Sequence, residues 1–138
     1  MWLIGKLHPV LVHFPIGLVL AAAAAELLAI WTRRSAWRAI AVANLRAGAA
    51  AGVITAIAGW ALASAPFIEP APLLVWHRWI GVAGATGAIG AALLSAAHDR
   101  SRRAVFAYQT ALFSAAALVA VAGHLGGALV WGADFLHP

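Results

Sequence analysis

The sequence predicts an all-α integral membrane protein, an up-down-up-down bundle of four transmembrane helices. Its 138 residues are 64% hydrophobic and 9% charged, whereas a soluble domain is about 45–50% apolar and about 25% charged. The mean hydropathy is +0.93. A soluble fold could not bury this much apolar surface, so we expect lipid to surround the chain. At roughly 20 apolar residues per span, residues 1–138 hold four or five spans and form a single transmembrane domain.

The first expected span covers about residues 10–31, and His13 and Glu26 are its only ionisable residues. A cleaved signal peptide is the alternative for this segment, but the apolar run exceeds the roughly 7–15 residues that such a peptide contains. An arginine-rich turn follows, in which residues 36–44 form either an interfacial helix or an extension of the second span.

The remaining spans are separated by a proline-rich turn and a second arginine-rich turn. They cover about residues 47–66, 75–97 and 104–131, each near the length that crosses the hydrocarbon. Because all connections are short, neighbouring helices should be antiparallel.

The positive charges predict the orientation. The two arginine-rich turns hold Arg33, Arg34, Arg38, Arg46, Arg100, Arg102 and Arg103. Only Lys6 and Arg78 lie on the other side, so the positive-inside rule places both termini in the periplasm. This predicts a multi-pass protein of the bacterial inner membrane. The same topology accounts for the net charge of +5, so no nucleic-acid partner is expected.

Four histidines fall in the predicted outer half of the bundle, although ionisable residues are rare inside spans. They are His8, His13, His77 and His124. At a rise of about 1.5 Å per residue, His13 and His124 lie about 10 Å deep, and His8 and His77 lie about 2–3 Å deep. Two imidazoles at matched depth predict a bis-histidine haem b. His13 and His124 are the preferred ligands of the haem iron, with His77 and His8 as alternates.

Small residues beside these histidines would let a flat macrocycle lie against the helices. Gly17 follows His13, Gly81 and Gly84 follow His77, and Gly123, Gly126 and Gly127 flank His124. Arg78 and Lys6 are the cations available for haem propionates on that side. The glycines equally fit close packing between helices.

Two local predictions accompany the haem site. His8 also fits a helix entry beside Pro9. Pro15 should free the backbone carbonyl of Leu11 for the ring of a nearby histidine.

At the inner rim, we expect Glu26 to pair with one of three arginines, namely Arg33, Arg34 or Arg46.

Two other functions stay open. Converging imidazoles would also bind a copper or zinc ion, although a regular helix turns His8 and His13 about 140° apart. Alternatively, the chain is a structural subunit whose Gly and Ala faces pack in a homo-oligomer or a larger membrane complex. The sequence contains no cysteine, P-loop, HExxH or GxSxG motif. Electron transfer is therefore favoured over stand-alone catalysis.

Three segments carry a resemblance to a known family. Residues 8–16 read HPVLVHFPI, residues 77–81 read HRWIG, and residues 123–127 read GHLGG. Together they resemble the bacterial membrane family catalogued as domain of unknown function 2231, in the form attached to periplasmic cytochrome c-type modules. The resemblance implies electron transfer at the outer face, with a c-type cytochrome or a quinone as partner. Because the chain has no CxxCH motif, such a partner would be a separate molecule.

Overall fold

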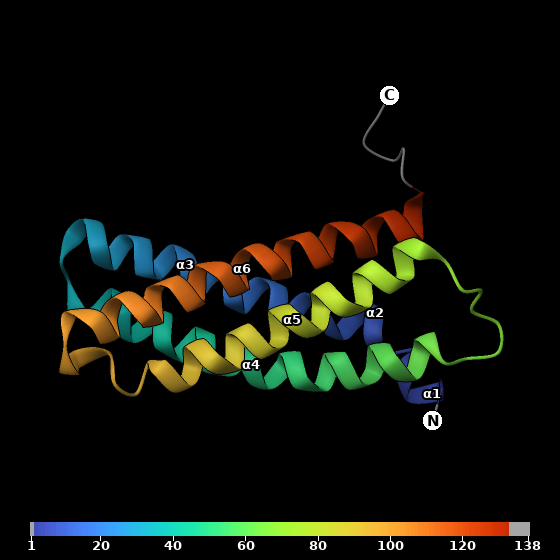
Figure 1. Ribbon diagram of the computed structural model, residues 1–138, viewed down its shortest axis with the longest axis horizontal. Coiled ribbons are helices and arrows are strands. Elements are labelled where there is room, and N and C mark those ends of the chain that lie inside the picture. Colours follow the sequence, from blue (N-terminus) through green and yellow to red (C-terminus); the bar gives the residue numbers. More distant parts are fainter. Residues whose placement is uncertain (1, 133–138) are drawn as a thin grey trace.

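A computed structural model describes residues 2–132, and all regular elements in this range are helical (Figure 1). The elements are α1 (Trp2–Gly5), α2 (His8–Leu11), α3 (His13–Thr32), α4 (Ser35–Ala63), α5 (Pro72–Leu94), the 3-10 turn η1 (His98–Arg100) and α6 (Arg102–Trp131). The predicted all-α class is confirmed.

Three segments are long and apolar enough to cross a membrane, namely Leu3–Thr32, Ser35–Ala63 and Arg102–Trp131. Helix α5 has 23 residues but is not among them, because four glycines, His77 and Arg78 reduce its apolar content.

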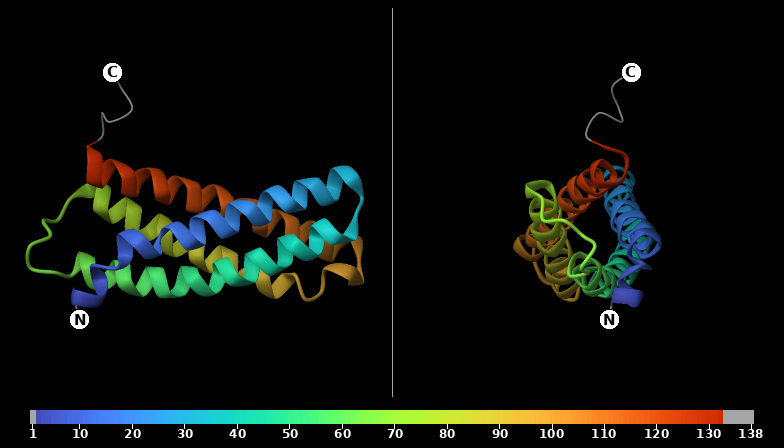
Figure 2. Two further views of the ribbon diagram at one scale, coloured as in Figure 1. Left: turned by 180° about the vertical axis from the view of Figure 1, so that it is seen from behind. Right: turned by 90° about the vertical axis from the view of Figure 1, so that its right-hand side faces the viewer.

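The four long helices α3, α4, α5 and α6 lie side by side along the long axis of the molecule (Figure 1). Viewed from its end, the bundle places them around a common axis (Figure 2). The α3–α4 turn and residues 95–103 lie at one end, here called the arginine end. Helices α1 and α2, residues 64–72 and the end of α6 lie at the opposite end, here called the histidine end.

Local chemistry explains where the helices begin. Helix α5 starts with Pro72 in its first turn, where a proline costs no helical hydrogen bond. The side chain of Ser101 caps α6 by accepting a hydrogen bond from the Ala104 amide at 3.1 Å. Helix α4 already begins at Ser35, so residues 36–44 extend the second span.

The interior of the bundle is built from small side chains. Ala22, Ala41, Ala91 and Ala115 are fully buried, whereas large apolar side chains such as Ile57 are exposed on the outside. Small interior residues let transmembrane helices approach closely. The outward-facing Leu, Ile, Phe and Trp side chains therefore form the surface that contacts lipid.

A break between α2 and α3 shapes the histidine end. Pro15 cannot donate a hydrogen bond to the carbonyl of Leu11, as expected. That carbonyl instead accepts a hydrogen bond from the Thr55 hydroxyl at 3.3 Å. The expectation that the Leu11 carbonyl would accept a hydrogen bond from a histidine ring was therefore wrong, because the hydroxyl of Thr55 on α4 occupies this position.

The buried carboxylate at the arginine end also has a partner other than those expected. Glu26 is fully buried and accepts hydrogen bonds from Arg38, with the shortest distance 2.7 Å. Arg33 and Arg34 lie in the connection between α3 and α4, and Arg46 bonds Ser95. The prediction of Arg33, Arg34 or Arg46 as partner was wrong because α4 extends back to Ser35 and places Arg38 against α3.

Candidate cofactor-binding site

A cavity of about 760 Å³ opens inside the histidine end. All four long helices, α2 and the 64–71 loop contribute to its walls. The walls are mainly apolar, and the polar or ionisable lining residues are His8, His13, Thr55, Trp60, Glu69, His77, Arg78 and Trp131. Its volume lies within the range of about 300–1,000 Å³ that is usual for cofactor and small-molecule sites.

His8 reaches into this cavity from α2. Its Nδ1 lies 3.0 Å from the backbone carbonyl oxygen of Thr55 on α4. A carbonyl oxygen only accepts hydrogen bonds, so Nδ1 donates, and in the neutral ring Nε2 then keeps its lone pair. The ring packs on Gly59, where an added Cβ would lie 2.8 Å from Cε1 of His8.

His77 has the same arrangement on the other side of the bundle. Its Nδ1 lies 2.9 Å from the backbone carbonyl oxygen of Ala122 on α6. The ring packs on Gly126, where an added Cβ would lie 3.0 Å from Cε1 of His77. Here too Nδ1 is the donor, and the lone pair of Nε2 stays available.

In both cases a glycine follows the accepting residue by four positions. A helical carbonyl points toward the amide of the residue four positions later, so a side chain at that position would cover it. Gly59 uncovers the carbonyl of Thr55, and Gly126 uncovers that of Ala122. The sequence analysis missed Thr55 and Gly59 and assigned Gly126 to His124. The four-residue spacing was a signal that could have found these residues.

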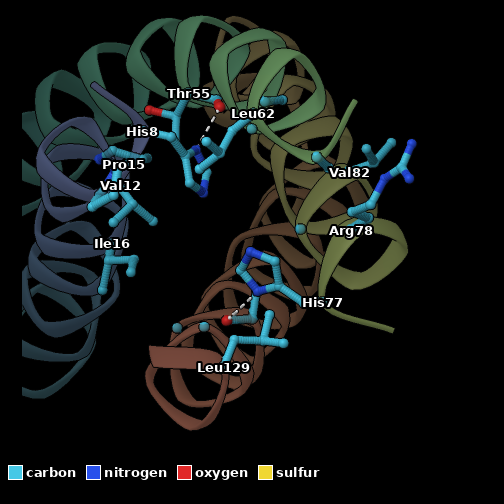
Figure 3. A pocket seen from close by; sticks show the side chains of 18 of the residues that line it. His8, Val12, Pro15, Ile16, Thr55, Leu62, His77, Arg78, Val82 and Leu129 are labelled. Atoms are coloured by element: carbon cyan, nitrogen blue, oxygen red, sulfur yellow. Dashed lines mark hydrogen bonds between the residues drawn. The ribbon is translucent and has the colours of Figure 1, made fainter. Parts of the chain in front are cut away.

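The two imidazoles face each other across the cavity. Their ring centroids are 6.0 Å apart and their planes are at 79°. Figure 3 shows both rings directed into the cavity from opposite walls, each bonded to its carbonyl on the far side. Two metal–imidazole bonds of about 2.0–2.1 Å would set opposed ring nitrogens about 4 Å apart. The distance from each ring nitrogen to its own ring centroid, counted for both rings, adds roughly 2 Å, which gives about the observed centroid separation of 6.0 Å.

The histidine pair preferred from sequence lies elsewhere. His13 is exposed at the margin of the cavity, and its Nδ1 lies 3.3 Å from the carbonyl oxygen of Val10 in its own segment. His124 is exposed on α6 and does not line the cavity. The structure brings together His8 and His77, the two alternates.

The remaining predicted site residues divide between the cavity and helix packing. Gly81 and Gly127 line the cavity. Gly84 packs against α6, where an added Cβ would lie 3.0 Å from Cγ2 of Val119. Gly17 is exposed and has no neighbouring atom within 4 Å of an added Cβ.

Arg78 lies at the edge of the cavity. Its guanidinium carbon is 3.6 Å from the centre of the Trp60 ring, a cation–π contact. Figure 3 shows its side chain extending away from the two imidazoles. A positive charge held there is placed to meet an anionic group that reaches the cavity mouth.

Comparison with family models matches residues 6–135 to the family described as "Predicted membrane protein (DUF2231)". The chain belongs to this family. The resemblance seen in the sequence is thereby confirmed. Comparison with curated proteins and comparison with solved structures each give no match.

The description of the family as a membrane protein agrees with the apolar outer surface of the bundle. Within residues 2–132 of the DUF2231 protein, no three His, Asp or Glu side chains gather where they could hold one metal ion. The cavity instead offers two opposed imidazole nitrogens in apolar surroundings. This donor set can supply both axial positions of a planar metal macrocycle.

Proposed function

We propose that this DUF2231 protein binds one haem b between His8 and His77 and transfers electrons at the histidine end. The observation that carries the proposal is the opposed histidine pair. Each ring donates Nδ1–H to a backbone carbonyl and turns Nε2 toward the cavity. Ligating histidines usually donate their other ring N–H in this way, which fixes the tautomer and the ring orientation.

The residues of the chain fit such a group. Imidazole nitrogens on both faces make haem iron six-coordinate, which favours electron transfer over oxygen chemistry. The walls around the two rings are mainly apolar. Arg78 provides a guanidinium at the rim that can bind a propionate in bidentate fashion.

Charge distribution supports the orientation that this function needs. Seven arginines lie near the arginine end, and the positive-inside rule assigns that end to the cytoplasm. We propose an up-down bundle in a bacterial inner membrane, with the histidine end at the periplasm. A periplasmic c-type cytochrome or a membrane quinone would then exchange electrons with the haem.

Two observations support this proposal over the two alternatives. Structural zinc sites use four protein ligands and catalytic zinc sites use three, whereas the cavity holds two facing imidazoles. For the structural-subunit alternative, several glycines are already used inside the bundle. Gly48, Gly84 and Gly87 pack against neighbouring helices of the same chain.

An absorption spectrum of the detergent-purified protein, oxidised and then reduced with dithionite, tests this function. The protein should be expressed in haem-sufficient cells, and its haem content measured per chain. We expect a Soret band, sharp reduced α and β bands and one haem per chain. His8→Ala and His77→Ala should each abolish the six-coordinate spectrum.

His124→Ala is the control outside the cavity, and His13→Ala tests an exposed histidine at the cavity margin that lies apart from the facing pair. They should keep the wild-type spectrum. If His13→Ala and His124→Ala lost haem while His8→Ala and His77→Ala kept it, the axial ligands would be His13 and His124. A folded wild-type protein without haem would overturn the proposal, and bound copper or zinc in that sample would select the metal-ion alternative.

A further inference from the structure

A second hollow lies at the arginine end, on the opposite side of the molecule from the histidine cavity. It has a volume of about 1130 Å³ and is formed by the α3–α4 turn, the start of α4, η1 and the start of α6. Its ionisable lining residues are Arg33, Arg34, Arg38, Arg46, His98, Asp99 and Arg102.

The charges around this hollow are not balanced. Arg38 is neutralised by Glu26, and Asp99 lies 3.0 Å from Nε2 of His98. The hollow also holds Arg33, Arg34 and Arg102, which form no ion pair with any residue in the range 2–132. The positive-inside rule explains why arginines occur at this end, but it does not require them to surround a common hollow.

Arg46 adds a fourth guanidinium to the same wall. Its contact within the described chain is a 3.3 Å hydrogen bond from Nη2 to the hydroxyl of Ser95. The lining of the hollow therefore combines five guanidinium groups with a single carboxylate, that of Asp99. Guanidinium groups bind the oxygens of phosphates and carboxylates in a planar, bidentate geometry, so this wall fits an oxyanion of this kind.

The apolar surroundings indicate which molecule carries the oxyanion. Ile30, Val42 and Val105 line the hollow beside the arginines. Ile30 is 47% exposed, so apolar surface adjoins the arginines on the outside of the bundle. A free phosphate ion would gain nothing from this apolar wall, whereas a phospholipid has acyl chains to cover it. Basic pockets at the ends of transmembrane helices bind anionic headgroups by this combination.

We infer that the arginine end is a binding site for the phosphate headgroup of an anionic phospholipid such as phosphatidylglycerol. The headgroup phosphate lies among Arg33, Arg34 and Arg102, and the acyl chains lie along the apolar side chains of Ile30, Val42 and Val105. The site is independent of the haem proposal, since it is at the other end of the bundle and shares no residue with the histidine cavity.

Native mass spectrometry and thermal unfolding of the full chain in a neutral detergent test the site. The delipidated protein is titrated with phosphatidylglycerol, phosphatidylcholine and inorganic phosphate in separate arms. We expect phosphatidylglycerol to bind with defined stoichiometry and to raise Tm, and the other two probes to do neither at the same concentration. Equal effects of phosphatidylcholine would overturn the charge argument, and equal effects of inorganic phosphate would overturn the lipid assignment.

A pair of double variants separates the hollow from general surface charge. Arg34→Gln with Arg102→Gln removes two positive charges from the hollow. Arg100→Gln with Arg103→Gln removes two from the same end, at residues that do not line it. The first variant should bind phosphatidylglycerol at least about tenfold more weakly, and the second should bind it like wild type. Equal weakening in both variants would refute a defined site.

Discussion

Arg38 provides the positive charge beside a carboxylate that lies entirely inside the bundle, so its removal should strongly destabilise the fold. Glu26 is 0% exposed, and its Oε1 accepts hydrogen bonds from Nη2 of Arg38 at 2.7 Å and from Nε2 of Gln109 at 2.8 Å. The Tyr108 hydroxyl lies 3.4 Å from Oε2. Arg38→Met would keep much of the side-chain volume but would leave Glu26 with neutral partners alone.

The structure sets the size of the effect. Removing one partner of a buried ion pair costs about 3–5 kcal/mol. The lower end applies here because Gln109 and Tyr108 remain and because the Arg38 side chain is 27% exposed. We expect Arg38→Met to lower the free energy of unfolding by about 3 kcal/mol. Glu26→Gln should cost less, about 1–2 kcal/mol, because the partly exposed Arg38 can stay hydrated.

Titration with sodium dodecyl sulfate in mixed micelles, followed by circular dichroism, measures this free energy. The double variant with both substitutions leaves no lone charge and should lose less than the sum of the two single losses. Arg100→Met is the control, since Arg100 is exposed and forms no ion pair among the described residues. If Arg38→Met stays within about 0.5 kcal/mol of wild type, Arg38 does not stabilise a buried charge and the reasoning is refuted.

Three further substitutions test other parts of the structure. Gly59→Ala would put a Cβ 2.8 Å from Cε1 of His8, so we expect a lower haem content per chain in the purified protein; an unchanged content would show that the ring does not need this space. Gly90→Ala, also in a helix but with no atom within 4 Å of the added Cβ, should leave haem content unchanged and raise the free energy of unfolding by up to about 1 kcal/mol. Ser101→Ala removes the cap on the Ala104 amide and should lower the free energy of unfolding by about 1 kcal/mol; no loss in detergent titration would argue against the cap.

The candidate site was predicted in part. The sequence placed His8, His13, His77 and His124 near one end of a helical bundle, and the cavity with His8 and His77 lies there. The preference for His13 and His124 used depth alone. A helix turns about 100° per residue, so depth says nothing about which histidine faces inward. The regular helix is also interrupted at Val12, between α2 and α3.

The sequence by itself determined the all-α class, the lipid-facing nature of the chain and the placement of seven arginines near one end and four histidines near the other. These are properties of composition and of order along the chain, and any bundle with short turns preserves them. The tertiary structure alone decided that Glu26 meets Arg38 and that two backbone carbonyls hold the rings of His8 and His77. Such contacts depend on the rotation of each helix about its axis, and that rotation is set by packing between glycine and alanine faces on different helices.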